Sequence, residues 1–153
     1  MLSVAVIILL SVFAKPALAA NTTDTKFEID APIDTFLQIQ DRQKTDTSSI
    51  FLRIDHMTGA HIRVAAYWSI PDDWGWYDQN LTYYGGTNVP WVRCQRGINY
   101  SVQSTIYETY SKGSMAYPCM ATLGFQSAIE SSDSIDGWWS VDSSRKHQTP
   151  IGP

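Results

Sequence analysis

The segment HIRVAAYWS, residues 61–69, alternates apolar and polar side chains with a period of two. Successive side chains of a β-strand point to opposite faces of its sheet, so this alternation predicts a strand with one buried face. We expect the strand to end at Pro71, because proline has no N–H to donate to a ladder. The side chains expected to face the core are Ile62, Val64, Ala66 and Trp68, and those expected to face outward are His61, Arg63 and Tyr67.

The residues before this segment show a similar pattern. Ile50, Leu52 and Ile54 fall on one face of a predicted strand over residues 50–55, and a short turn containing Gly59 follows. Two alternating runs joined by a short turn are typical of a β-hairpin. We therefore expect residues 50–55 and 61–69 to pair with each other.

Further strands are expected over most of the chain. Residues 99–110 fit both a strand and a helix, and their β-branched and aromatic content favours a strand. Residues 41–49 contain no apolar side chain and predict a surface loop. The other predicted strands cover residues 26–30, 36–40, 89–94, 119–126 and 135–141. Seven or eight short antiparallel strands predict an all-β fold, either a β-sandwich or a distorted barrel.

The composition is that of one globular domain. Of the 153 residues, 44% are hydrophobic and 17% are charged, as is usual for a folded domain. The 15 acidic residues outnumber the 11 basic ones, which gives a formal net charge of −4. Because no basic stripe is present to neutralise phosphates, nucleic acid is not an expected partner.

The N-terminal residues have features of an export signal. An apolar run over residues 4–14 is too short to span a bilayer comfortably, and Ala17-Leu18-Ala19 fits a signal-peptidase site. No basic residue precedes the run, so we expect the true start to lie further upstream. An uncleaved anchor is the alternative. The expected organisation is a signal peptide (1–19), a flexible lead-in (20–26), one β-sandwich domain (27–142) without a transmembrane span, and a loose tail (143–153), in a secreted protein.

The chain has two cysteines, Cys94 and Cys119. In an exported protein an even number of cysteines usually forms disulfides, so we expect a Cys94–Cys119 disulfide. The alternative is two separate buried thiols. His56, His61 and His147 do not have the spacing of metal ligands, so neither a metal nor another cofactor is expected.

A stretch rich in aromatic and acidic residues follows the strand predicted at 61–69. It has no sustained periodicity, which indicates a long loop or a loose hairpin. Flat rings beside carboxylates suit a sugar, which offers an apolar C–H face and a rim of hydroxyls. Alternatively, the rings cover a sheet edge or cap a thin sandwich, whereas Trp68 and Trp139 fit core positions. The candidate ligand-binding residues are Asp72, Asp73, Trp74, Trp76, Tyr77, Asp78, Tyr83 and Tyr84.

No catalytic constellation is recognisable in the sequence. Asp72, Asp73 and Asp78 do not match a calcium loop, and a solvated acidic turn is the simpler interpretation, as it is for Asp133 with Asp136. Glu108 and Glu130 cannot be placed opposite a second acid, as glycoside hydrolysis requires. Asn21, Asn80 and Asn99 begin N-x-[ST] sequons, which matter only in a host that glycosylates. We therefore expect no catalytic residue.

Several short patterns resemble an uncharacterised family of small secreted all-β proteins of Gram-positive bacteria. The matching residues are scattered over most of the expected mature chain: Phe27-x-Ile29, then Arg42-Gln43-x-Thr45-x-Thr47, a strand running into Gly59, and Gly137-Trp138-Trp139-Ser140-x-Asp142-Ser143. This resemblance implies secretion and an all-β fold, and it supplies no catalytic residue. The aromatic insertion around residues 70–86 departs from the pattern.

Two functions are compatible with these features. The first is non-catalytic binding of a glycan or another cell-envelope component through the aromatic segment. The second is a secreted interaction protein, such as an antibacterial toxin, an immunity factor or a surface-assembly subunit, which acts on a protein or a membrane.

Overall fold

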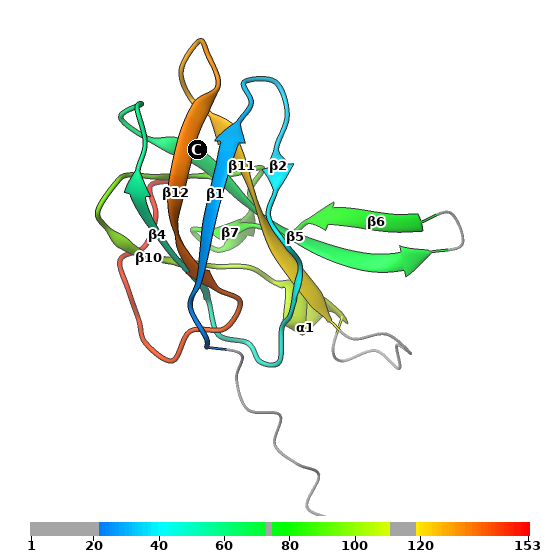
Figure 1. The fold of residues 1–153 in the computed structure, drawn as a ribbon. Coiled ribbons are helices and arrows are strands. Elements are labelled where there is room, and N and C mark those ends of the chain that lie inside the picture. Colours follow the sequence, from blue (N-terminus) through cyan, green and yellow to red (C-terminus); the bar gives the residue numbers. More distant parts are fainter. Residues whose placement is uncertain (1–21, 73–74, 111–118) are drawn as a thin grey trace, which may run out of the picture.

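The computed structural model of the chain describes residues 22–72, 75–110 and 119–153 (Figure 1). The predicted signal peptide, residues 1–19, lies outside them. Within these residues the chain forms twelve strands and one short helix: β1 (Thr25–Ala31), β2 (Leu37–Gln38), β3 (Arg42–Gln43), β4 (Ile50–His56), β5 (Ile62–Asp72), β6 (Gly75–Asn80), β7 (Tyr83–Tyr84), β8 (Thr87–Asn88), β9 (Val92–Cys94), β10 (Asn99–Val102), α1 (Ile106–Tyr110), β11 (Met120–Ser127) and β12 (Asp133–Ser140). The first strand includes the last two residues of the predicted lead-in.

Two antiparallel sheets and a small two-stranded ribbon make up the fold. One sheet has the order β1-β12-β4-β10 and the other β2-β11-β5-β6, with β3 pairing β11 and β9 pairing β5. Strands β7 and β8 form the ribbon. Neither sheet closes into a barrel, so the prediction of an all-β, sandwich-like fold is confirmed. The strands outnumber the prediction because several are only two residues long.

The alternating segment of β5 supplies one wall of the core. Its four inward side chains are at most 3% exposed, as predicted. They pack in one cluster with residues of both sheets, and a stacked pair of rings, Phe27 of β1 and Phe125 of β11, joins the sheets with centroids 5.0 Å apart. Trp139 is 1% exposed in the same cluster, which confirms that Trp68 and Trp139 are core residues.

The predicted hairpin between β4 and β5 is wrong. Strand β4 pairs with β12 and β10, whereas β5 pairs with β11, β6 and β9 in the other sheet. The turn between them crosses from one sheet to the other, and the buried carboxylate of Asp133 accepts hydrogen bonds from the backbone N–H groups of Thr58 (2.8 Å) and Gly59 (3.0 Å). Asp133 is therefore a turn-fixing residue, not part of a solvated acidic turn. Alternation identifies a buried face but does not say in which sheet a strand lies.

Two C-terminal predictions also need correction. Residues 99–110 are not one strand, because β10 ends at Val102 and helix α1 begins at Ile106. The tail after residue 143 is not loose: Gln148 forms a bridge with Tyr100 of β10, and Ile151 forms one with Arg93 of β9. The tail thus connects an edge of one sheet to an edge of the other.

The predicted disulfide is not formed, since Cys94 and Cys119 are both free thiols. The register on β5 explains why. Cys94 pairs with Ile62 at one end of β5, and Cys119 directly precedes Met120, which pairs with Ser69 seven residues further along. Seven residues of extended strand span roughly 23 Å, far beyond the reach of a disulfide. The alternative of two separate thiols therefore describes this structure.

Candidate functional site

The aromatic segment predicted as a site is mostly a β-hairpin. Strand β6 pairs with β5 as far as Asp72, whereas β11 pairs with β5 only as far as Ser69. Among the described residues the end of the hairpin is therefore two-stranded, and β5 and β6 extend away from the rest of the fold (Figure 1). Asp73 and Trp74 lie outside the described residues, and the side chains of Asp72, Trp76, Tyr77 and Asp78 are not described. The site prediction for these six residues stays a prediction.

The adjacent residues Tyr83 and Tyr84 have different surroundings in the structure. Both lie in β7, which turns into β8 at Gly85 and Gly86, and both glycines have positive φ (60° and 92°), as a two-residue hairpin turn requires. The ring of Tyr84 covers Gly152 of the C-terminal segment so closely that a Cβ there would lie 2.7 Å from its Cε1 atom. Tyr84 therefore packs the tail against the fold, whereas Tyr83 lines a cavity.

A hydrogen-bonded turn fixes the position of Tyr83. The Asn80 Oδ1 atom accepts from both the backbone N–H and the hydroxyl of Thr82, and the Thr82 Oγ1 atom accepts the N–H of Ala66 at 2.8 Å. The N–H of Tyr83 then donates to the carbonyl of Gln103 at 2.9 Å. The side-chain amide of Asn80 donates to Pro90 O, so this sequon asparagine has a structural role.

Tyr83 forms part of a polar cavity of about 360 Å³, here called the tyrosine cavity. Two residues that line this cavity, Ser104 and Glu108, each have a buried side-chain oxygen, Oγ and Oε2, without a hydrogen-bond partner within the described part of the chain. Nearly all buried polar groups in native proteins are paired, so two unpaired atoms in one cavity require an explanation. Its lining residues come from three parts of the chain: Thr47, Ser49, Tyr83, Gln103, Ser104, Thr105 and Glu108.

A larger neighbouring cavity of about 540 Å³ shares Thr47, Ser49 and Gln103 with the first. It is here called the cationic cavity, because Arg145, Lys146 and His147 line it and no Asp or Glu does among the described residues. The hydroxyl side chains that line it are those of Thr47, Ser48, Ser49, Ser101, Ser143, Ser144 and Thr149. The two adjoining cavities are here together called the polar groove. A third hollow, of about 350 Å³, continues past Arg145 and His147 to Asp24.

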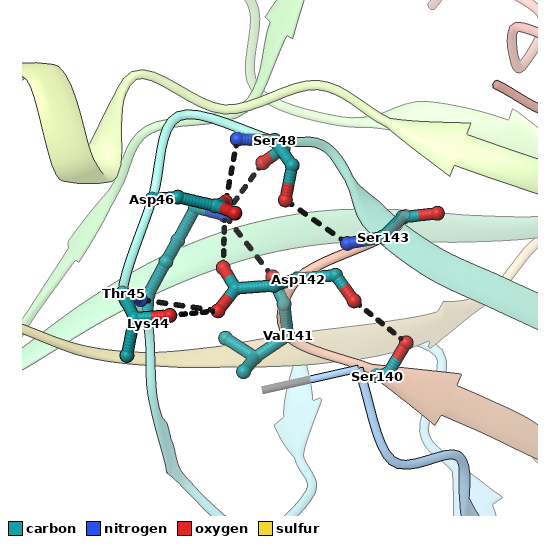
Figure 2. Close-up of polar contacts among 8 residues, drawn as sticks. All are labelled: Lys44, Thr45, Asp46, Ser48, Ser140, Val141, Asp142 and Ser143. Atoms are coloured by element: carbon teal, nitrogen blue, oxygen red, sulfur yellow. Dashed lines mark hydrogen bonds and ion pairs between the residues drawn. The ribbon is translucent and has the colours of Figure 1, made fainter. Parts of the chain in front are cut away.

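A buried ion pair holds the walls of this groove together (Figure 2). The Lys44 Nζ atom lies 3.0 Å from Asp142 Oδ1, and both side chains are fully buried. The ammonium also donates to the carbonyl oxygens of Ser48 (2.5 Å) and Val141 (3.1 Å), so each of its three protons has an acceptor.

The second oxygen of Asp142 is equally well paired. Asp142 Oδ2 accepts from the backbone N–H of Thr45 (3.1 Å) and from its hydroxyl (2.7 Å). In addition, Ser48 Oγ accepts a hydrogen bond from the N–H of Ser143 at 3.0 Å. This group of contacts, here called the clasp, joins the loop 44–49 to the segment 140–143, and both line the groove.

The thiol of Cys119 lies close to the charges of both regions. Burial raises its pKa to about 11, while Lys44 lowers it, and Asp142 and Glu108 raise it further. Burial also raises the pKa of Cys94 in the core. Both thiols are therefore protonated at neutral pH, and a protonated thiol is a poor nucleophile.

Lys44, Asp142, Ser104 and Glu108 were not assigned to a site from the sequence. Residues 41–49 were expected to be a surface loop, yet Lys44 is 1% exposed and Arg42–Gln43 form β3. The family resemblance was the one indication of this contact in the sequence. Its two longest patterns, which begin at Arg42 and at Gly137, lie next to each other in the fold. The Arg42 guanidinium lies 5.4 Å from the centre of the Trp139 ring, and Thr45 binds Asp142.

No group of three or more His, Cys, Asp or Glu side chains suited to a metal ion occurs within residues 22–72, 75–110 and 119–153. In the same residues no helix is long and apolar enough to cross a membrane.

Comparison with known proteins identifies a family. The model of DUF2712, described as a protein of unknown function, matches residues 11–143. No curated protein and no solved structure matches the chain. Because the match covers most of its length, the chain belongs to the uncharacterised DUF2712 family.

Proposed function

We propose that this protein is a non-catalytic glycan-binding protein and that the tyrosine cavity is its binding site. The observation that carries the proposal is that two residues lining the same cavity as Tyr83, Ser104 and Glu108, each have a buried oxygen without a hydrogen-bond partner among the described residues. A buried carboxylate oxygen without a donor is costly, and a ligand hydroxyl that donates to it removes that cost.

The residue types in the cavity match the surface of a sugar. An aromatic ring packs against the apolar C–H face of a pyranose, while carboxylate, hydroxyl and amide groups pair with its hydroxyls. Glu108 supplies the acceptor, and Ser49, Thr47 and Gln103 supply groups that both donate and accept. The volume of about 360 Å³ falls in the range of small-molecule sites.

The same cavity is poorly equipped for hydrolysis. Glycoside hydrolysis uses two carboxyl groups on opposite sides of the bond that is cleaved. Among the described residues Glu108 is the one carboxylate that lines the tyrosine cavity, and Asp142 is paired with Lys44 and Thr45. Binding without catalysis is therefore the function that this geometry supports best.

The proposal includes export and a cell-envelope ligand. The apolar run and Ala17-Leu18-Ala19 support secretion. A secreted protein meets the polysaccharides of the cell envelope first, so peptidoglycan fragments are the first ligands to test.

The test is calorimetric titration of the purified protein with muramidase-released peptidoglycan fragments and with a panel of neutral oligosaccharides. We expect saturable binding that Tyr83→Ala and Glu108→Gln each weaken about tenfold or more, the loss of one good contact. Trp138→Ala is the matched aromatic control, because Trp138 is 40% exposed on β12 and does not line the groove. Equal affinities of Tyr83→Ala and the native protein would refute the site.

A second candidate function rests on the projecting end of the β5–β6 hairpin. There β5 and β6 pair beyond the last β5–β11 pair, and the sequence of this segment is rich in aromatic residues (Trp74, Trp76 and Tyr77). Exposed aromatic side chains are typical of surfaces that bind a protein or a membrane. Co-sedimentation with anionic vesicles, compared between the native protein and Trp76→Ala, separates this function from glycan binding.

A further inference from the structure

The charge along the polar groove is unevenly distributed. The whole chain is acidic, with 15 acidic against 11 basic residues, yet Arg145, Lys146 and His147 line the cationic cavity and none of its described lining residues is an Asp or Glu. Asp142, the nearest acid in sequence, is fully buried and neutralised by Lys44. Among the described residues the cationic cavity thus has more basic than acidic side chains, and the carboxylate of Asp24 lines the adjoining hollow with Arg145 and His147.

The hydroxyl groups of the cavity are arranged to donate. Ser48 Oγ accepts the N–H of Ser143, and Ser101 Oγ accepts the N–H of His147. Among the described residues neither hydroxyl donates to a protein acceptor. A serine oxygen that already accepts a backbone N–H still has its own proton to offer, so both can donate to a ligand.

The backbone that presents the cations is held in place. Ser143 Oγ donates to the carbonyl of Arg145 at 2.8 Å, and the ring of His147 lies against Phe51 with centroids 4.9 Å apart. Beyond this segment, Gln148 is bridged to Tyr100. A fixed backbone reduces the entropy that is lost when a ligand orders the cationic side chains.

From these observations we propose that the cationic cavity binds a tetrahedral oxyanion, a phosphate or sulfate group. Such a group needs several donors and compensating positive charge, and this cavity supplies guanidinium, ammonium and hydroxyl donors together. The proposal extends the proposed function, because the shared residues Thr47, Ser49 and Gln103 let one ligand occupy both cavities. A glycan that carries a phosphate or sulfate ester has the required combination of groups.

The oxyanion site is tested with inorganic phosphate and sulfate and without any sugar. Each salt is titrated into the ¹⁵N-labelled protein, with sodium chloride at matched ionic strength as the control. We expect saturable shifts of the amide signals of residues 143–149 and of the His147 ring that chloride does not cause. In the Arg145→Ala/Lys146→Ala double variant, phosphate affinity falls about tenfold or more, the loss expected when charge-assisted hydrogen bonds are removed.

The matched control is Lys26→Ala/Arg96→Ala, which removes the same charge from exposed positions outside the groove. Equal weakening in both double variants would show that the anion responds to net charge alone and would overturn the proposal. Unchanged affinity in Arg145→Ala/Lys146→Ala would overturn it as well. A circular-dichroism melt of each variant checks that the fold is retained.

The outcomes separate this proposal from glycan binding. Phosphate binding without any response to neutral sugars, and with no tighter binding of a phosphorylated oligosaccharide than of inorganic phosphate, supports the oxyanion site and rejects the glycan proposal. The converse result, sugar binding without a phosphate response, rejects the oxyanion site alone. If both sites are occupied by one ligand, a phosphorylated oligosaccharide binds more tightly than its unphosphorylated form, and Arg145→Ala/Lys146→Ala abolishes the difference.

Discussion

The clasp and the tyrosine cavity share the loop 44–49, but they differ in how their buried polar atoms are paired. In the clasp, all three protons of the Lys44 ammonium and both oxygens of Asp142 have partners. In the tyrosine cavity, Ser104 Oγ and Glu108 Oε2 have none in the part of the chain that the structure describes. Complete pairing is what a structural element needs, whereas incomplete pairing leaves groups for a ligand.

The largest effect is expected from breaking the clasp. Asp142→Asn leaves the buried Lys44 ammonium without a countercharge, and removal of one partner from a buried pair typically destabilises by about 3–5 kcal/mol. The control is Arg53→Ala, which breaks the Arg53–Asp55 pair. That pair is shorter, at 2.7 Å, but its side chains are 48% and 33% exposed, so the cost is at most about 1 kcal/mol. Urea unfolding measures both, and similar losses would contradict the distinction.

The double variant Lys44→Met/Asp142→Leu sharpens this result. It removes both charges, so no unpaired ion remains buried, and we expect it to be more stable than Asp142→Asn. A double variant that is less stable than Asp142→Asn would show that the hydrogen bonds to Thr45, Ser48 and Val141 outweigh the cost of burying the two charges.

The buried thiols predict a loss of stability at alkaline pH. Burial raises the pKa of Cys94 and of Cys119, so both stay protonated in the folded state where the unfolded chain ionises. The two thiols therefore make their full contribution to the free energy of unfolding below the ordinary thiol pKa. This contribution is lost as the pH rises above that value, at up to about 1.4 kcal/mol per pH unit for the fully buried Cys94. Urea unfolding at pH 7 and pH 10 tests this. Cys94→Ala should reduce the difference between the two pH values, and an unreduced difference would argue against the thiol.

Ser104→Ala tests the cavity side of the comparison. The Ser104 hydroxyl is buried without a partner, so its removal should leave the free energy of unfolding unchanged or slightly higher. The same variant should weaken glycan binding in the calorimetric titration. A clear loss of stability would mean that Ser104 is a structural residue like those of the clasp.

The smallest expected effect is on the thiol of Cys119. Because the charge of Glu108 raises the pKa of this thiol, Glu108→Gln should lower it. The rate of alkylation of Cys119 as a function of pH, read by peptide mass spectrometry, measures the change. A glycan that pairs with Glu108 should also alter this rate in the native protein, which would connect the two regions in one experiment.

Predictions from the sequence succeeded where they depended on local alternation. Residues 61–69 identified β5 and its buried face, and Trp68 and Trp139 were placed in the core for the same reason. The expected end of this strand at Pro71 was wrong, because β5 continues to Asp72 and Pro71 lies opposite Trp76 of β6. Predictions of pairing failed, as with the β4–β5 hairpin and the Cys94–Cys119 disulfide. Pairing depends on residues distant in the chain, and a period of two carries no information about them.

The candidate site was the least predictable part. A polar stretch such as residues 41–49 is indistinguishable from a solvated loop until its partner is known, and the partner of Lys44 lies 98 residues away. The aromatic pattern gave the same weight to Tyr83, which lines the tyrosine cavity, and to Tyr84, which packs on Gly152.

The sequence by itself determined the all-β class and the membership of the buried faces, because alternation is a local property of each strand. Only the tertiary structure decided which strands share a sheet, that Lys44 and Asp142 form a buried pair, and that the tail joins β10 to β9. It also decided that Tyr83, Ser104 and Glu108 share one cavity. The physical reason is that hydrogen bonds and ion pairs form between groups that meet in space, and the two-sheet packing brings distant segments of this chain together.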